Sequence, residues 1–276
     1  MHPQDLFSLF GVGIDLYTIM FVVGIIACLL FAIFAMNKCG YSNTARDTII
    51  TIGIFSIMFG LLFAALFQAF YNLIAGKGFT FEGMTFIGGL IGGVLAFVGI
   101  YFLYVYVINP RLKEKSFFKS DMNKGIWYLL RIAPISICIA HGFGRIGCLC
   151  AGCCYGHETH EWYGIWNEYL GYKTVPIQLW EAIFLFVLAA VMMVLLTLKQ
   201  KDNMAIYLVS YGIWRFIIEY FRADYRGDFI PGLSPSQFWS IIMILAGIAI
   251  FFVYRHFDKK IEEKNNNNTV DEANSQ

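Results

Sequence analysis

Residues 16–36 read LYTIMFVVGIIACLLFAIFAM, an apolar run that contains no charged side chain and directly follows Asp15. A helix needs about 20 mostly apolar residues to cross the hydrocarbon core of a bilayer. This run is long enough, and it therefore predicts a transmembrane helix. It lacks a cationic leader and a cleavage site of small residues, so we expect a retained helix rather than a signal peptide.

The rest of the chain continues this pattern. Hydrophobic residues make up 58% of the 276 residues, charged residues only 14%, and the mean hydropathy is +0.63. Such a composition excludes a soluble domain and predicts an integral membrane protein. We expect an all-α protein with about seven transmembrane helices, at residues 16–36, 48–73, 84–108, 126–143, 177–198, 204–221 and 238–254.

The chain divides into one membrane domain and a polar tail. Residues 1–257 contain all the expected spans and are predicted to form a single multi-pass domain. Residues 258–276 turn to Lys, Glu and a run of Asn. Because this composition has little apolar area to bury, we expect a disordered tail.

The distribution of Lys and Arg predicts the orientation. Cytoplasmic loops accumulate these residues, and here one set of alternate loops, which includes residues 109–125, carries most of them. We therefore expect the N-terminus outside and the C-terminus in the cytoplasm. The net charge of +1 gives no reason to expect a nucleic-acid partner.

The polar segment of greatest interest is residues 141–156, HGFGRIGCLCAGCCYG, where the fourth helix is expected to reach the outer face. A charge inside the membrane costs about 2.5–3.5 kcal/mol on insertion scales and normally marks a functional site. Arg145 stands among glycines, and a fixed guanidinium beside accessible backbone suits anion binding. The alternative is a structural ion pair. His141 lies one turn earlier on the same face and could act as a base.

The sixth stretch repeats this theme with Arg215, Glu219 and Arg222 at positions i, i+4 and i+7. Arg215 and Glu219 can pair on one helical face, as a packing device or as part of a site. Two arginine-bearing helices that meet at the outer leaflet favour a phosphate-carrying ligand. In a membrane, the simplest such ligand is a phospholipid headgroup.

Four cysteines, Cys148, Cys150, Cys153 and Cys154, follow the arginine of the 141–156 segment. The pattern C-x-C-x2-C-C lacks the paired C-x2-C knuckles that make a zinc motif specific. A disulfide is an alternative, because the outer face of the membrane is oxidising, but the sequence does not show which two cysteines would pair. We favour small buried residues in a tight turn, and we assign no metal and no cofactor.

Several motifs of this chain resemble those of the bacterial prolipoprotein diacylglyceryl transferases. The resemblance covers most of the chain from Tyr17 to the last span, and the motifs occur in the same order. The most specific motif is GRIG at residues 144–147, followed by Gly152 and Gly156. Three further stretches match: TFIGGLIG at residues 85–92, PIQLWE at 176–181 and YGIWRFIIEYFR at 211–222.

This resemblance implies a reaction and a location. Members of the family move the diacylglyceryl group of phosphatidylglycerol onto the lipobox cysteine of a preprolipoprotein, which forms a thioether and releases glycerol phosphate. The implied partners are phosphatidylglycerol, the signal peptides of preprolipoproteins and the lipid bilayer. The implied location is the bacterial plasma membrane, with the active site toward the outer leaflet.

The resemblance also implies roles for individual residues. Arg145 would hold the phosphate, Arg215 would bind or activate the headgroup, and Glu219 would orient it. His141 completes the catalytic candidates. The expected substrate-binding residues are Tyr17, Gly88, Gly89, Gly144, Gly152, Gly156, Gln178, Glu181 and Arg222. For the glycines at positions 88 and 89, close helix packing is the alternative reading.

Three positions depart from the family pattern. Ile87 stands where histidine is usual, Cys148 where asparagine is usual and Cys153 where glutamate is usual. Either the chain is a divergent member with the same reaction, or the scaffold serves another lipid or acceptor. A thiol-redox or metal-binding membrane protein is the third alternative. His141 is the candidate that would replace the missing base.

Overall fold

The computed structural model describes residues 7–9, 12–74, 76, 78–81, 85–108, 125–198, 202–223 and 232–274. The chain packs as two compact units, one of Met1–Phe31 with Trp127–Gln276 and the other of Ala32–Ile126. The single membrane domain expected for residues 1–257 stays a prediction.

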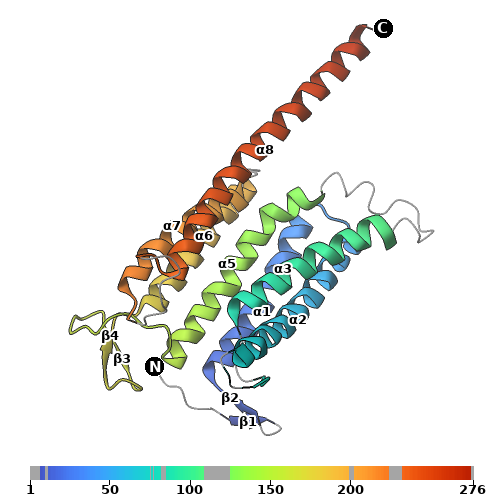
Figure 1. Ribbon diagram of the computed structural model, residues 1–276. Helices are drawn as coiled ribbons and strands as arrows, with labels where there is room; N and C mark the ends of the chain where they lie inside the picture. The colour runs from blue at the N-terminus through green and yellow to red at the C-terminus, as the bar shows by residue number, and fades with distance from the viewer. Residues whose placement is uncertain are drawn as a thin grey trace. The chain divides into compact units, whose positions relative to one another are not determined.

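The first unit contains most of the helices and two short hairpins (Figure 1). The hairpins are antiparallel, and the second places Ile165 opposite Thr174. The elements are β1 (Phe7–Leu9), β2 (Val12–Ile14), the greater part of α1 (Leu16–Lys38), α5 (Gly125–Ala151), β3 (Ile165–Asn167), β4 (Tyr172–Thr174), α6 (Ile177–Thr197), α7 (Asn203–Ile218) and α8 (Pro235–Asn274). A single 3₁₀ turn, Glu219–Phe221, follows α7.

The core of the first unit lies between α5, α6 and α7. Its fully buried side chains include Ile135, Leu185 and Met192. Glycines let the backbones approach: a Cβ on Gly142 would lie 2.7 Å from the Phe186 ring, and one on Gly212 would lie 3.0 Å from the backbone oxygen of residue 240. In lipid, close packing of this kind is a main source of helix association.

The start of α1 is fixed by a helix cap. Asp15 Oδ1 accepts hydrogen bonds from the hydroxyl and the backbone N–H of Thr18, at 2.7 and 2.8 Å. These two bonds hold the pKa of Asp15 below its usual value. Further along the helix, a Cβ on Gly24 would lie 3.0 Å from the backbone oxygen of Ala140, so the two backbones approach closely there. The first part of α1 is therefore anchored along α5.

The second unit is built on α2 (Asn43–Ile74) and α3 (Phe86–Leu103), which continues as a π-helical turn, Tyr104–Ile108. The two helices run side by side (Figure 1). A Cβ on Gly60 of α2 would lie 3.0 Å from the backbone oxygen of Gly89 on α3, and one on Gly88 would meet Phe67 at 2.6 Å. Gly88 and Gly89 of α3 thus do serve close helix packing.

Within the described residues, six helices are long and apolar enough to cross a membrane, namely α1, α2, α3 with its π-helical turn, α5, α6 and the first part of α8. The remaining helix, α7, has 16 residues, which corresponds to about 24 Å against a hydrocarbon core of about 30 Å. The expected number of about seven spans therefore stays a prediction, as does the orientation.

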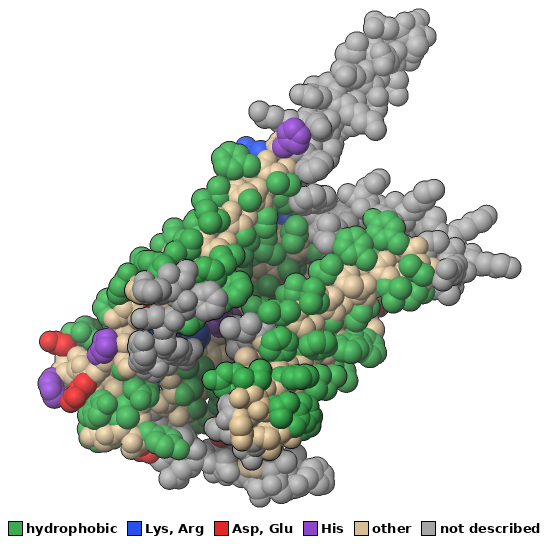
Figure 2. Space-filling view, in the orientation of Figure 1, with side chains coloured by type: hydrophobic (Ala, Val, Ile, Leu, Met, Phe, Trp, Pro, Cys, Tyr) green, Lys and Arg blue, Asp and Glu red, His purple; other side chains and the backbone are tan. Residues whose placement is uncertain are grey.

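The helices carry apolar side chains on their outward faces. Hydrophobic side chains dominate the visible helix surfaces (Figure 2), and Phe55, Leu95 and Phe252 are at least half exposed. A soluble protein rarely exposes apolar patches this extensive, whereas a lipid-facing surface requires them.

The last helix extends beyond its apolar part. In the structure α8 continues as a helix to Asn274, although the composition of residues 258–276 favours disorder. The disordered tail stays a prediction.

We predict that Gly60→Val destabilises the pair of α2 and α3 by about 1–3 kcal/mol, because the new side chain must push apart two backbones that are in contact. The matched control is Gly53→Val on the same helix, since a Cβ there meets nothing within 4 Å. Thermal unfolding in nanodiscs should show a clearly lower midpoint for the first variant only. Equal midpoints would contradict the packing described here.

Candidate active site

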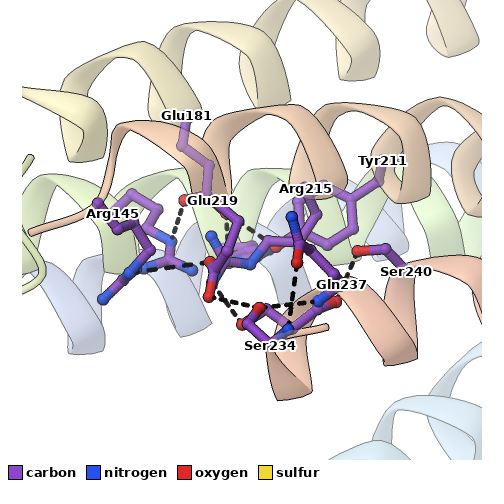
Figure 3. Close-up of polar contacts among 11 residues, drawn as sticks. Arg145, Glu181, Tyr211, Arg215, Glu219, Ser234, Gln237 and Ser240 are labelled. Carbon is purple, nitrogen blue, oxygen red and sulfur yellow. Dashed lines mark hydrogen bonds and ion pairs between the residues drawn. The ribbon is translucent and has the colours of Figure 1, made fainter. Parts of the chain in front are cut away.

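A buried carboxylate, Glu181 on α6, joins side chains from α5 and α7 (Figure 3). Its Oε2 lies 3.0 Å from Nε of Arg145, and its Oε1 accepts a 2.8 Å hydrogen bond from the hydroxyl of Tyr211. The Nε2 atom of His141 lies 3.9 Å from the same Oε1, with its ring edge-on to Tyr211. One carboxylate therefore brings the α5 arginine, the α5 histidine and an α7 tyrosine together.

The contact between Arg145 and Glu181 is an ion pair whose geometry is too poorly aligned for a hydrogen bond at Nε. The arginine side chain is only 16% exposed. In the described part of the chain, its two terminal amino groups have no hydrogen-bond acceptor. A buried guanidinium with free donors suits a further anion.

A second ion pair lies at the end of α7. Nη2 of Arg215 is 2.7 Å from Oε2 of Glu219, which confirms the i, i+4 pair expected from the sequence. The same Nη2 donates a 2.8 Å hydrogen bond to the hydroxyl of Ser236. Nε of Arg222 lies 3.8 Å from Glu219. Nη1 of Arg215 is buried, and no described residue accepts a hydrogen bond from it.

The start of α8 supports this pair through a capping box. The backbone N–H of Gln237 donates to the Ser234 hydroxyl at 3.2 Å, and the backbone N–H of Ser234 donates to the Gln237 side chain at 3.1 Å. The Ser234 hydroxyl in turn donates to Glu219 at 3.0 Å. Sequence reasoning missed these residues, although Ser-x-x-Gln with Pro235 at the first helical position is a helix-start signature.

The two ion pairs belong to one network (Figure 3). Arg215 interacts electrostatically with Glu181 as well as with its own partner. The described network contains three guanidinium groups, from Arg145, Arg215 and Arg222, against two carboxylates. The buried Nη1 of Arg215, for which no described residue provides an acceptor, favours an anionic ligand. Tyr211, which sequence reasoning did not select, begins the motif at residues 211–222.

The end of α5 forms a Schellman motif. The backbone N–H of Gly152 donates to the backbone oxygen of Leu149, and that of Cys153 donates to the backbone oxygen of Cys148, each at 3.2 Å. Gly152 adopts φ +70°, a conformation that favours glycine. The motif brings Cys148 and Cys153 together, and with Cys154 they form a cysteine cluster whose Sγ atoms all lie within 4.8 Å of one another.

Polar side chains brace the loop that follows α5. Gln178 donates a 2.6 Å hydrogen bond to the backbone oxygen of Cys153, and Asn167 donates one of 3.1 Å to that of Gly152. Gly156 pairs with Arg222 in a β-bridge, and a Cβ there would lie 2.7 Å from the backbone oxygen of Phe221. Three of the expected binding residues, Gly152, Gly156 and Gln178, thus have structural contacts of their own.

The acidity of one thiol in the cysteine cluster is shifted by its neighbours. Hydrogen bonds from the side chains of Cys148 and Cys153, together with the neighbouring Arg222, lower the pKa of the Cys154 thiol below its usual value. No two cysteines of the described chain are joined by a disulfide.

The remaining expected residues lie in different places. Tyr17 packs its ring against Gly147 of α5 and stays 39% exposed. Gly144 has open space around it, because a Cβ there would meet nothing within 4 Å. Gly88 and Gly89 belong to the other unit, and the side chain of Ile87 lies outside the described residues. Their roles in binding stay predictions.

Fold and site together define an all-α integral membrane protein with a polar site of paired arginines and carboxylates. The chain belongs to the prolipoprotein diacylglyceryl transferase family, whose model matches residues 4–253. The family assignment made from the sequence motifs is therefore confirmed.

Relatives with the same family name match nearly the whole chain. A phosphatidylglycerol–prolipoprotein diacylglyceryl transferase of Clostridium tetani is 31% identical over 263 residues, which cover 91% of this chain and 97% of the relative. One of Dehalococcoides mccartyi is 30% identical, with 94% and 96% covered. A Clostridium perfringens protein, the transferase numbered 2, is 30% identical, with 88% and 92% covered.

We predict that Glu181→Ala lowers the free energy of unfolding by about 3–5 kcal/mol, because it leaves a buried guanidinium without its counter-charge. The double variant Arg145→Met with Glu181→Met should recover much of this loss, since no unpaired charge remains. Thermal unfolding of the single and double variants in nanodiscs measures the coupling. Purely additive effects would show that the two side chains do not interact.

Proposed function

We propose that this protein transfers the diacylglyceryl group of phosphatidylglycerol to the lipobox cysteine of preprolipoproteins. Family membership supports the reaction class. The observation that carries the assignment to this site is the network of three guanidinium groups and two carboxylates, in which the buried Nη1 of Arg215 has no acceptor among the described residues. Such a donor suits a phosphate oxygen.

In the proposed reaction the acceptor thiol loses its proton, and its sulfur forms a bond to the glyceryl carbon of the lipid. The bond from that carbon to the phosphate oxygen breaks, and its electron pair leaves with glycerol phosphate. The phosphate changes from a singly charged diester to a monoester that carries more negative charge. Arg145 and Arg215 would therefore hold the transition state more tightly than the bound lipid, which is the condition for catalysis.

The carboxylates have positioning roles in this scheme. Glu181 would fix Arg145 from α6, and Glu219 would fix Arg215 from the end of α7. His141 is the candidate to accept the thiol proton, because its imidazole lies beside Glu181, the carboxylate that pairs with Arg145.

The location follows from the same proposal. The substrates are a membrane lipid and the membrane-inserted signal peptide of a preprolipoprotein, so the protein would work in the bacterial plasma membrane. The Lys and Arg distribution of the loops supports a site that faces the outer leaflet.

We predict that Arg145→Lys lowers transferase activity by about 10- to 100-fold, because a lysine keeps the charge but loses the planar fork that binds two oxygens. The assay depletes the host's own transferase, expresses the variant and measures diacylglyceryl on the lipobox cysteine of a reporter by mass spectrometry. Arg255→Lys is the matched control, since Arg255 is 62% exposed on α8.

Three outcomes separate the alternatives. Activity in the wild type that falls in Arg145→Lys and not in the control supports the site. Full activity in Arg145→Lys would place the phosphate elsewhere. No mass shift with the wild-type protein, despite good membrane expression and a reporter from the source organism, would mean that the scaffold serves another lipid or acceptor.

We predict that His141→Gln reduces turnover and that raising the pH partly restores it, because more of the acceptor is then already a thiolate. The pH profile of the mass-shift assay with purified protein provides the measurement. Wild-type turnover of this variant at every pH would remove His141 from the mechanism.

A further inference from the structure

The cysteine cluster, Cys148, Cys153 and Cys154, is a group of nucleophilic side chains that the proposed transfer does not use. Its three Sγ atoms lie within 4.8 Å of one another. The Schellman motif accounts for the contact between Cys148 and Cys153. In this motif the backbone N–H of the second residue after the helix cap, here Cys153, donates to the backbone oxygen of a residue in the last turn, here Cys148. An apolar pair normally occupies these two positions, whereas here two thiols meet.

The third thiol reaches the cluster through an unusual backbone. Cys154 adopts φ +60°, and it is the only described residue other than glycine with a positive φ. This conformation costs a cysteine about 1–2 kcal/mol. Such strain persists where the surrounding structure fixes it, and it is commonest at ligand-binding sites. Gln178 supplies the fixation, because its 2.6 Å hydrogen bond holds the backbone oxygen of the preceding residue.

The geometry suits a soft divalent cation. Zinc binds thiolate sulfur at about 2.3 Å in a tetrahedron, which places sulfurs about 3.8 Å apart. The observed separations, at most 4.8 Å, exceed that spacing by no more than about 1 Å. Small side-chain movements would therefore convert the cluster into a three-thiolate site. Cys150 lies in the same segment but is not a member, because its thiol falls outside the group.

We propose that Cys148, Cys153 and Cys154 bind one zinc ion and that its fourth position takes the thiol of the acceptor cysteine. Three protein ligands with one open position is the arrangement of reactive rather than structural zinc sites. Cys153 is exposed, so a ligand can reach the cluster from outside. This proposal departs from the expectation of no metal drawn from the sequence. The sequence lacks the paired C-x2-C motif, and the three thiols come together only through the backbone turn that follows α5.

The acceptor half of the proposal rests on the proposed function. A prolipoprotein cysteine offers a soft sulfur ligand, and the cluster lies close enough to Arg145 for electrostatic interaction with Cys148 and Cys154. On binding, the acceptor S–H bond would break, its proton would pass to His141, the proposed base, and the sulfur would remain as a metal-bound thiolate. The sulfur would then stand beside the arginine that is proposed to hold the phosphate.

The first experiment measures metal content. The full-length protein is purified in nanodiscs, reduced with a phosphine, loaded with zinc alone and dialysed, and zinc is measured by mass spectrometry. We expect one zinc per chain in the wild type and in Cys150→Ser, and a loss of most of it in Cys148→Ser, Cys153→Ser and Cys154→Ser. Thermal unfolding of each apo variant shows whether it is folded.

Three results would overturn the zinc site. The first is the absence of retained zinc in the reduced, folded wild-type protein, and the second is equal retention in folded Cys154→Ser. The third is a disulfide between two of the three cluster cysteines in protein alkylated directly in intact cells. Zinc retention is measured without turnover, so a protein that binds zinc but gives no reporter mass shift would contradict the proposed function and leave the metal site intact.

The second experiment tests the open position. Cobalt replaces zinc, and the thiolate-to-cobalt absorption is recorded while a lipobox peptide is added. We expect the band to shift and intensify with the cysteine peptide and to stay unchanged with the matched serine peptide. An unchanged spectrum with both peptides, from a protein that carries out the transfer, would overturn the acceptor role.

Discussion

Buried positive charge is the constraint on which the rest of the site depends. A guanidinium removed from water requires a counter-charge and hydrogen-bond acceptors. Glu181 on α6 supplies the counter-charge for the α5 arginine, and Glu219 supplies it for Arg215. These requirements tie α5, α6, α7 and the start of α8 together at one end. Among the described residues, Nη1 of Arg215 is buried without an acceptor, which leaves a donor for an anionic ligand.

Helix ends are the second source of organisation. The first N–H groups and the last carbonyl groups of a helix need partners that the helix itself does not provide. At the end of α5, the Schellman motif satisfies them and gathers Cys148 with Cys153. At the start of α8, the capping box satisfies them and aims the Ser234 hydroxyl at Glu219. In both places a local backbone requirement also positions reactive or polar groups beside the arginines.

The glycines of this chain show how a motif combines several physical roles. Gly152 caps α5 with a positive φ, and Gly156 allows a close approach to the backbone of Phe221. Gly89 lets α3 contact α2 in the other unit. Gly144 differs from these, since no described atom would meet a side chain there. The open space beside Arg145 is compatible with access for a ligand, whereas the other three glycines are already explained by the fold.

The sequence by itself determined the membrane class, most of the helices, the family and the pairing of Arg215 with Glu219, because these depend on composition, order and helical period. It did not determine the partner of Arg145, the role of Tyr211 or the meeting of three thiols. Those contacts join different helices or depend on one left-handed residue, Cys154. Neither a crossing between distant segments nor a turn conformation leaves a period in the sequence, so only the tertiary structure decided them.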